Sequence, residues 1–119
     1  MLKSIQERIQ AIPQEIRKVT ASEAAQEIKE NQGILIDVRE PSESTESPVR
    51  PSFIIPRGIL EMKVLEKFKN PDRPVYLHCA SGVRAQLAAE QLYRLGYTQT
   101  NAIISDIGEI QNVFNQDSP

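Results

Sequence analysis

The sequence has few of the features that would tie it to a membrane, a nucleic acid or an oxidising compartment. Cys79 is its only cysteine, so no disulfide can form within the chain. The formal net charge is −2 and the lysines and arginines are scattered, which gives no electrostatic reason to expect a nucleic acid partner. Residues 1–10 carry charges and lack the continuous apolar stretch of a signal peptide or membrane span. We therefore expect a cytoplasmic protein with no nucleic acid and no membrane partner.

The chain divides into a short amino-terminal arm, residues 1–18, and one domain, residues 19–119. With 119 residues, 39% of them hydrophobic and 25% charged, it has room for a single hydrophobic core. Apolar residues recur in the arm at helical spacing, and Pro13 interrupts the helix that this spacing predicts. We interpret the arm as packing on the domain's own core, with a dimerisation or partner-binding surface as the alternative, and expect a monomer. The apolar residues of the arm are Leu2, Ile5, Ile9, Ile12 and Ile16.

From residue 19 onward, short β-like runs alternate with helical segments, which is typical of an α/β fold with a parallel sheet. Thr20 and Glu23 form a capping-box pattern that starts the first helix, and Gly33 is the expected stop. Residues 40–51 are rich in serine and proline, which predicts an irregular surface loop. The predicted strands are residues 34–38, 53–55, 75–79 and 102–104.

Cys79 stands where an apolar run meets the start of a helix. The run 75–79 delivers it to the carboxyl edge of the sheet, where open α/β sheets bind their ligands. The helix that follows ends at Gly96. Its predicted buried face consists of Leu87, Ala88, Leu92 and Leu95. The residues that this geometry nominates as a binding cradle are Ala80, Ser81, Gly82, Val83 and Arg84.

This placement indicates a reactive thiolate at Cys79. A thiol is a nucleophile when ionised, and the N–H groups and dipole at a helix start favour its anionic form. Gly82 can adopt the torsions that turn several N–H groups toward one point, and Arg84 adds a permanent positive charge. We therefore expect an anion or thiolate in the cradle. In the alternative interpretation, Cys79 is an inert core cysteine, and the native protein would be alkylated slowly.

The residues around Cys79 resemble a known family. Cys79-Ala80-Ser81-Gly82-Val83-Arg84 is similar to the active-site loop of single-domain rhodaneses, and Leu35-Ile36-Asp37-Val38-Arg39-Glu40-Pro41 is similar to their upstream signature strand. Ile55-Pro56-Arg57-Gly58 resembles the segment before their middle helix, so the resemblance covers residues 19–115. It implies a three-layer rhodanese-like domain whose five-stranded parallel sheet has helices on both faces, preceded here by the helical arm.

The resemblance also implies a sulfurtransferase. Cys79 would take sulfane sulfur from thiosulfate or a persulfide and pass it to a thiol or cyanide, with Arg84 attracting the anionic donor. The implied partners are a small-molecule sulfur donor and a thiol acceptor, and a protein sulfur donor also fits. No metal and no cofactor are expected. Ala80 and Val83 are uncharged where many relatives carry charge, which favours a persulfide over thiosulfate as the donor.

Two other functions remain open. A catalytically weak rhodanese-like module could bind a partner through its arm or carry sulfur. Protein tyrosine phosphatases, some related in fold to rhodanese, also place His-Cys before an anion cradle, as at His78-Cys79. Their cysteine and arginine are one residue farther apart than the four residues that separate Cys79 from Arg84, which argues against a phosphatase.

Three charged or titratable residues near the cradle are interpreted as structural. His78 alternates to the strand face opposite Cys79, which favours a satisfied core histidine. Asp37 and Arg39 are expected to pair with each other or with the backbone beside the active loop. The chain departs from the family pattern at residues 47–51, at Ser44 and at residues 105–106, so the site's rim and the last strand-to-helix turn must be built differently.

Overall fold

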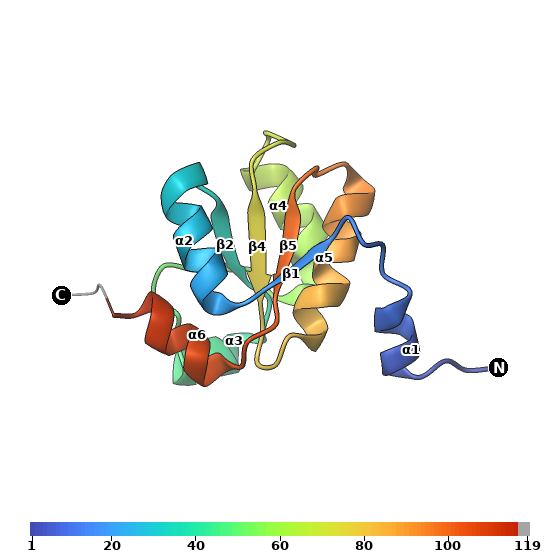
Figure 1. Ribbon diagram of the computed structural model, residues 1–119, viewed down its shortest axis with the longest axis horizontal. Coiled ribbons are helices and arrows are strands. Elements are labelled where there is room, and N and C mark those ends of the chain that lie inside the picture. Colours follow the sequence, from blue (N-terminus) through green and yellow to red (C-terminus); the bar gives the residue numbers. More distant parts are fainter. Residues whose placement is uncertain (117–119) are drawn as a thin grey trace.

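The structure, a computed structural model, describes residues 1–116 and has a five-stranded sheet at its centre (Figure 1). All strand pairs are parallel and the order is β1-β5-β4-β2-β3. The predicted α/β class and five-stranded parallel sheet are therefore confirmed. The strands are β1 (Arg17–Val19), β2 (Ile34–Asp37), β3 (Phe53–Ile54), β4 (Val75–His78) and β5 (Thr100–Ile103).

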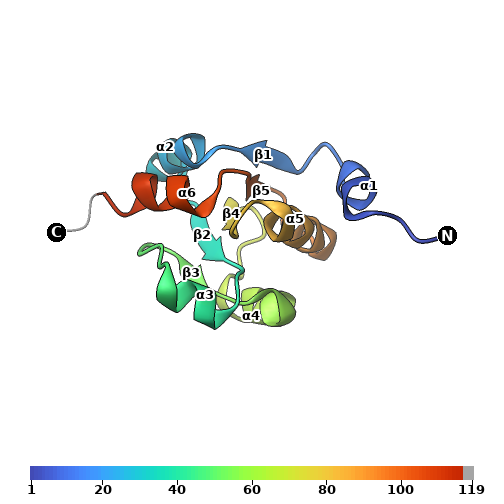
Figure 2. The same cartoon turned by 90° about the horizontal axis from the view of Figure 1, so that it is seen from below.

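Helices cover both faces of this sheet, which gives the three layers that the family resemblance implied (Figure 2). One face carries α4 and α5, with the arm helix α1 beside α5, and the other carries α2 and α6. A short helix, α3, lies near the carboxyl edge of the strands. The helices are α1 (Ile5–Gln10), α2 (Ala21–Asn31), α3 (Pro41–Glu46), η1 (Arg57–Ile59, a 3-10 turn), α4 (Leu60–Lys67), α5 (Val83–Leu95) and α6 (Ile107–Phe114).

The hydrophobic core has two halves because side chains alternate across each strand. In β4, Val75 and Leu77 pack on the α4–α5 side, whereas Tyr76 packs on the α2–α6 side. Cys79 continues the alternation on the α4–α5 side, with Ala85 of α5 in the same cluster. The sheet is thus buried on both faces, as its continuous apolar runs predict.

The start of α2 lies where its sequence pattern placed it. The Thr20 side chain accepts a hydrogen bond from the Glu23 amide, and the Glu23 carboxylate accepts one from the Thr20 amide. The helix ends before Gly33, because Gln32 adopts the left-handed conformation with φ 57°. Gly33 is needed for space, since a Cβ there would lie 2.7 Å from Cε1 of Tyr76.

The prediction of an irregular loop over residues 40–51 is wrong in part, because α3 occupies Pro41–Glu46. Pro41 stands at a position where a helix needs no N–H donor, and the Glu43 carboxylate accepts a hydrogen bond from the Glu40 amide at 3.0 Å. The segment is almost wholly polar, so its sequence has no apolar periodicity to reveal a helix.

Two apolar segments are more exposed than the sequence suggests. Leu95, assigned to the buried face of α5, is 42% exposed because the helix ends there at Gly96. Phe53 and Ile54 are exposed because β3 is an edge strand that pairs only with β2. Ile55, the third residue of that run, is buried.

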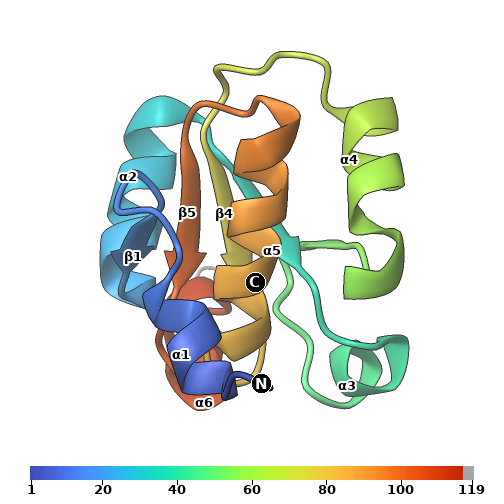
Figure 3. The same ribbon diagram turned by 90° about the vertical axis from the view of Figure 1, so that its right-hand side faces the viewer.

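The arm has two parts. Helix α1 is capped by Ser4 and ends before Pro13, so the predicted interruption is confirmed. Ile12 and Ile16 are buried in the α4–α5 half of the core, whereas Leu2 and Ile5 are exposed. Figure 3 shows α1 in front of α5, and an Arg8–Glu90 ion pair joins the two helices.

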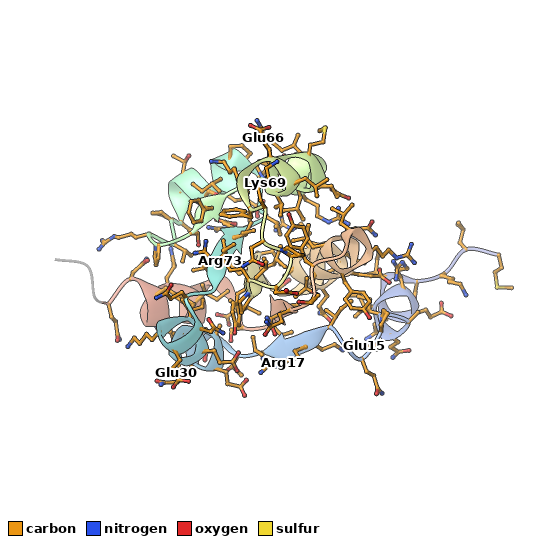
Figure 4. All side chains as sticks on the ribbon, turned by 90° about the horizontal axis from the view of Figure 1, so that it is seen from above. Glu15, Arg17, Glu30, Glu66, Lys69 and Arg73 are labelled. Carbon is orange, nitrogen blue, oxygen red and sulfur yellow. The ribbon has the colours of Figure 1, made fainter. Side chains whose placement is uncertain are left out.

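The labelled side chains of Glu30, Glu66 and Lys69 lie on the outside of the molecule (Figure 4). Within residues 1–116, none of the helices combines the length and the apolar character needed to cross a bilayer.

Candidate functional site

The loop that carries Cys79 joins the end of β4 to the start of α5 at the carboxyl edge of the sheet (Figure 1). Cys79 directly follows His78, the last residue of β4. The Ile107 amide at the start of α6 donates to the Ala80 carbonyl at 2.9 Å, which ties this loop to the neighbouring helix. The parallel strands therefore bring residues distant in sequence to one edge.

The sulfur of Cys79 is surrounded by backbone N–H groups. The Gly82 amide lies 3.1 Å and the Ala85 amide 3.4 Å from Sγ, and both donate to it. First-turn amides of a helix have no intrahelical acceptor, and the helix dipole adds positive potential at that end. This arrangement stabilises negative charge on sulfur. Cys79 is only 1% exposed, so neighbouring atoms must move before a substrate reaches Sγ.

Gly82 makes the tight approach of the loop to the sheet feasible. Its φ is +95°, in the left-handed region that favours glycine. A Cβ on Gly82 would also lie 3.1 Å from Cα of Ile104, which follows β5. Both the torsion and the close contact therefore require glycine at the position whose amide contacts Sγ.

Arg84 does not stand free in the cradle. Its Nη1 and Nη2 donate to the two carboxylate oxygens of Glu43 on α3, at 2.6 and 2.9 Å. Hydrogen bonding by Arg84 lowers the pKa of Glu43 to about 2, and the bond to Glu43 raises the pKa of Arg84. Both side chains are about one-third exposed. The positive charge that the sequence assigned to a sulfur donor is thus already paired.

A second ion pair supports the upstream part of the site. Arg39 forms two side-chain hydrogen bonds to Asp37, as predicted, and Ser44 of α3 donates to Asp37 Oδ2 at 2.8 Å. Burial raises the pKa of Asp37, but hydrogen bonds from Arg39 and Ser44 and the nearby His78 together outweigh it, so that pKa lies below its usual value. Arg39 also donates to the Ser47 carbonyl at 2.7 Å. These contacts fix α3 against β2.

His78 is fully buried and lies on the opposite strand face from Cys79, as predicted. Its Nε2 is 2.7 Å from the Ser52 hydroxyl, but its Nδ1 lies 4.0 Å from Asp37 Oδ1 without a hydrogen-bond partner, so the expectation of a satisfied histidine is wrong for one ring nitrogen. Burial lowers the pKa of His78 to about 4. The imidazole is therefore neutral near pH 7 and ties β4 to the segment before β3.

The sequence-predicted residues thus meet at one place, with one difference. Gly82 contributes its amide, the Ala80 carbonyl accepts from α6, and Ser81 on the loop and Val83 at the start of α5 are exposed. Arg84 lies beside them but is directed to Glu43. Sequence reasoning did not assign roles to three side chains that bind the charged and titratable residues around the site. These are Glu43, Ser44 and Ser52, which contact Arg84, Asp37 and His78 respectively. The Glu-x-x-Glu spacing that begins at a residue preceding proline was the available indication of a helix start.

The surface also has a groove that lies away from the Cys79 loop. A groove of about 800 Å³ runs between α2, α6 and the β3 edge, with Phe53 and Phe114 in its lining. None of residues 79–84 lines it. Over residues 1–116, no three histidine, cysteine, aspartate or glutamate side chains come together in a way that could hold a metal ion.

Comparisons with known proteins agree with this architecture. The rhodanese-like domain family model matches residues 20–108. A tRNA sulfurtransferase from Shewanella halifaxensis is 34% identical over 83 residues, which are 68% of this chain but 17% of that protein. The chain thus spans less than a fifth of the length of this curated relative.

Two solved structures are also similar. A Rhodopseudomonas palustris protein of unknown function, described as a possible tyrosine phosphatase, has a TM-score of 0.80 at 21% identity, covering 94% of this chain and 92% of that one. The reduced form of Bacillus anthracis CoADR-RHD has a TM-score of 0.68 at 31% identity, covering 86% of this chain and 18% of that one. At 21% identity the first likeness shows the fold alone.

Proposed function

The chain belongs to the rhodanese-like domain family, and on that premise we propose that it is a sulfurtransferase that carries sulfane sulfur as a persulfide on Cys79. The observation that carries the proposal is the convergence of the Gly82 and Ala85 amides on Sγ. Backbone donors placed around a sulfur atom stabilise both a thiolate and the persulfide anion that replaces it. The similarity to a tRNA sulfurtransferase supports the same reaction class.

In the first step, the Cys79 thiolate attacks the outer sulfur of the donor. A new S–S bond forms on Sγ, the bond between the donor's two sulfur atoms breaks, and its electron pair leaves with the donor residue. That leaving group is sulfite when the donor is thiosulfate, and a thiolate when the donor is a persulfide. The amides at the start of α5 hold the resulting negative charge.

In the second step, an acceptor thiolate or cyanide attacks the outer sulfur of the Cys79 persulfide. The bond between the two sulfurs breaks, and the electron pair returns to Sγ as the thiolate. The products are a new persulfide or thiocyanate, and the protein is ready for another cycle. Neither step needs a general base, which agrees with the placement of His78 on the other strand face.

We propose a persulfide rather than thiosulfate as the preferred donor. Ala80 and Val83 place no charge on the loop, and the only cation within residues 79–84 is Arg84. Because the guanidinium pairs with Glu43, the loop has little charge left to attract a dianion. Comparing kcat/KM for thiosulfate and for glutathione persulfide tests this preference. A higher value for thiosulfate would reject it while leaving sulfur transfer intact.

A phosphatase function has less support. Four residues separate Cys79 from Arg84, one fewer than in protein tyrosine phosphatases, so the loop is shorter than one that encloses a phosphate ester. Arg84, the residue that would clamp phosphate, pairs with Glu43. Hydrolysis of p-nitrophenyl phosphate is therefore expected to stay at background while sulfur transfer proceeds.

The deciding experiment is mass spectrometry of the intact protein after incubation with a sulfur donor. The protein is expected to gain the mass of one sulfur atom and to lose it on addition of a thiol. Because Cys79 is the only cysteine, any such gain reports on one site. Cys79→Ser is the matched control and is expected to gain nothing.

The burial of Cys79 favours one competing function, a domain that binds a partner without turning over sulfur. Failure of the native, folded protein to take sulfur from thiosulfate, glutathione persulfide and polysulfide would support that function. We also propose that the protein is a monomer and that it works in the reducing environment of the cytoplasm, where thiols are available as sulfur acceptors.

A further inference from the structure

We propose that Glu43 determines the donor preference of this site by holding Arg84 in an ion pair, so that a dianionic donor meets no free cation on the loop of residues 79–84. The inference rests on the proposed sulfur transfer through Cys79. It assigns a specificity role to a residue on α3, a helix outside the loop that carries the sulfur.

The first support is the position of Arg84. It lies in the first turn of α5, immediately before Ala85, whose amide donates to Sγ. The pKa of Arg84 is raised, chiefly by its hydrogen bond to Glu43 and to a smaller extent by the proximity of Cys79. This cation is therefore the one within the loop that could assist a donor or leaving group at Sγ, provided that it is free.

The second support is the geometry of the ion pair. Each of the two outer guanidinium nitrogens donates to a different carboxylate oxygen of Glu43, the fork arrangement that arginine makes best. Such a pair has no net charge. A dianion arriving at Sγ would either displace the carboxylate from Arg84 or lie beside it and be repelled.

The third support is that contacts of α3, the helix that carries Glu43, hold this residue in place. Its Oε1 accepts the Glu40 amide at 3.0 Å, and the next residue, Ser44, is anchored to Asp37. Arg39 fixes the end of the helix through the Ser47 carbonyl. The carboxylate is thus presented to Arg84 by a capped and anchored helix, and it does not depend on a chance surface contact.

The two donor classes respond differently to this pair. Thiosulfate brings two negative charges and releases sulfite, which also carries two. A persulfide releases a thiolate with a single charge on its sulfur, and the carboxylates of glutathione lie several bonds from the reacting atoms. The Gly82 and Ala85 amides donate to Sγ with either donor. Pairing of Arg84 therefore penalises thiosulfate more than it penalises a persulfide.

The test is Glu43→Gln, because glutamine can still accept the Glu40 amide in the capping box but carries no charge to pair with Arg84. The expected result is that kcat/KM for thiosulfate rises about tenfold, a change of ~1.4 kcal/mol, while the value for glutathione persulfide changes less than about threefold. Inhibition by added sulfite is expected to strengthen in parallel. Glu46→Gln, on an exposed residue of the same helix, makes the same charge change and is expected to leave both donors unchanged.

Adding Arg84→Gln to Glu43→Gln is expected to abolish the gain, which a general electrostatic effect of α3 would not do. If the folded Glu43→Gln protein used thiosulfate no better than the parent, or lost both donors equally, the inference would be wrong while persulfide loading of Cys79 stood. If Glu43→Gln folds poorly, Glu43→Asp, whose shorter side chain weakens the fork, is expected to give a smaller rise in the same direction. Failure of the parent and variants to load Cys79 from either donor would overturn the proposed function itself.

Discussion

At the scale of single residues, backbone amides surround the sulfur of Cys79, and Arg84, the only cation of residues 79–84, is paired with Glu43. The two N–H groups that donate to Sγ belong to Gly82 and Ala85. The identity of these two residues therefore matters only through the backbone conformation that it permits. At these two positions, substitutions that leave the backbone path unchanged should have small effects, and those that change it should have large ones.

Gly82→Ala is expected to lower the free energy of unfolding and to slow sulfur loading of Cys79. The left-handed torsion costs a non-glycine residue about 1–2 kcal/mol, and crowding against backbone adds to it, for a total of about 2–3 kcal/mol. The crowding is specific, because the added Cβ would lie 3.1 Å from Cα of Ile104. Denaturant unfolding and the loading rate by mass spectrometry measure the two effects.

Substitutions at two other glycines separate the cost of the backbone torsion from the cost of crowding. Gly96 also has a positive φ, +112°, but has open space around it, so Gly96→Ala is expected to cost only the torsional part, about 1–2 kcal/mol. Gly58 has open space and no such torsion, and Gly58→Ala is expected to change stability by less than about 0.5 kcal/mol. Equal costs at Gly82 and Gly96 would show that the Ile104 contact is unimportant.

His78 is expected to make stability depend on pH above the range of the carboxylates. Burial lowers its pKa to about 4 in the folded protein, against 6.5 for the free group, so the unfolded chain binds a proton that the folded one does not. The free energy of unfolding should therefore contain the full contribution of neutral His78 above pH 6.5, and it should fall by about 2–3 kcal/mol as the pH drops to 4. Urea unfolding at successive pH values measures this slope.

Because the chain has a single histidine, the assignment can be checked directly. His78→Gln retains a polar group within reach of Ser52 but does not titrate, so the slope between pH 6.5 and 5 should disappear whatever the variant's overall stability. Glu43 and Asp37 act below this range, because their stabilisation is complete above the ordinary pKa values of 4.5 and 3.8 and is lost as the pH falls from there toward their lower folded values. An unchanged slope in the variant would contradict the assignment.

At the scale of secondary-structure elements, the pattern of apolar residues predicted the buried strands, and a capping pattern predicted the start of α2. The runs 34–38 and 75–79 became β2 and β4, and the Thr20 cap started α2. α3 was missed because its stability comes from capping and polar anchoring, which leave no hydrophobic period in the sequence. β1 was missed because two of its three residues are exposed.

The anchoring of α3 leads to a prediction at Ser44. This side chain is buried and donates to Asp37 Oδ2, so Ser44→Ala leaves a buried carboxylate oxygen with one bond fewer. The expected loss of stability is about 1–3 kcal/mol. Ser42→Ala, at an exposed position of the same helix, is the control and is expected to cost less than about 0.5 kcal/mol. Equal effects would mean that α3 is held by other contacts.

The same limit explains what sequence reasoning could and could not say of the site. Cys79, the loop after it and the fold follow from local patterns and a family resemblance. The pairing of Arg84 with Glu43 joins residues 41 positions apart in sequence, on two different helices. Nothing local encodes such a contact, because it depends on where parallel strands bring their carboxyl ends.

At the scale of the whole molecule, the arm and the domain share one core and one buried charge. Ile12 and Ile16 lie in the α4–α5 cluster, and Arg8 pairs with Glu90 of α5, the helix that begins at the cradle. The Glu90 side chain is only 4% exposed, whereas that of Arg8 is 36% exposed. The two ends of this ion pair are therefore not equivalent.

This asymmetry predicts unequal effects of removing either partner. Arg8→Ala leaves a buried carboxylate without its cation and is expected to cost about 2–3 kcal/mol, whereas Glu90→Gln removes the buried charge itself and is expected to cost less than about 1 kcal/mol. The double variant should be more stable than Arg8→Ala alone, as measured by denaturant unfolding. Three equal, small effects would mean that α1 contributes no charge compensation to the fold. Recovery in the double variant would show instead that the arm neutralises a buried charge on the helix whose first turn holds the sulfur.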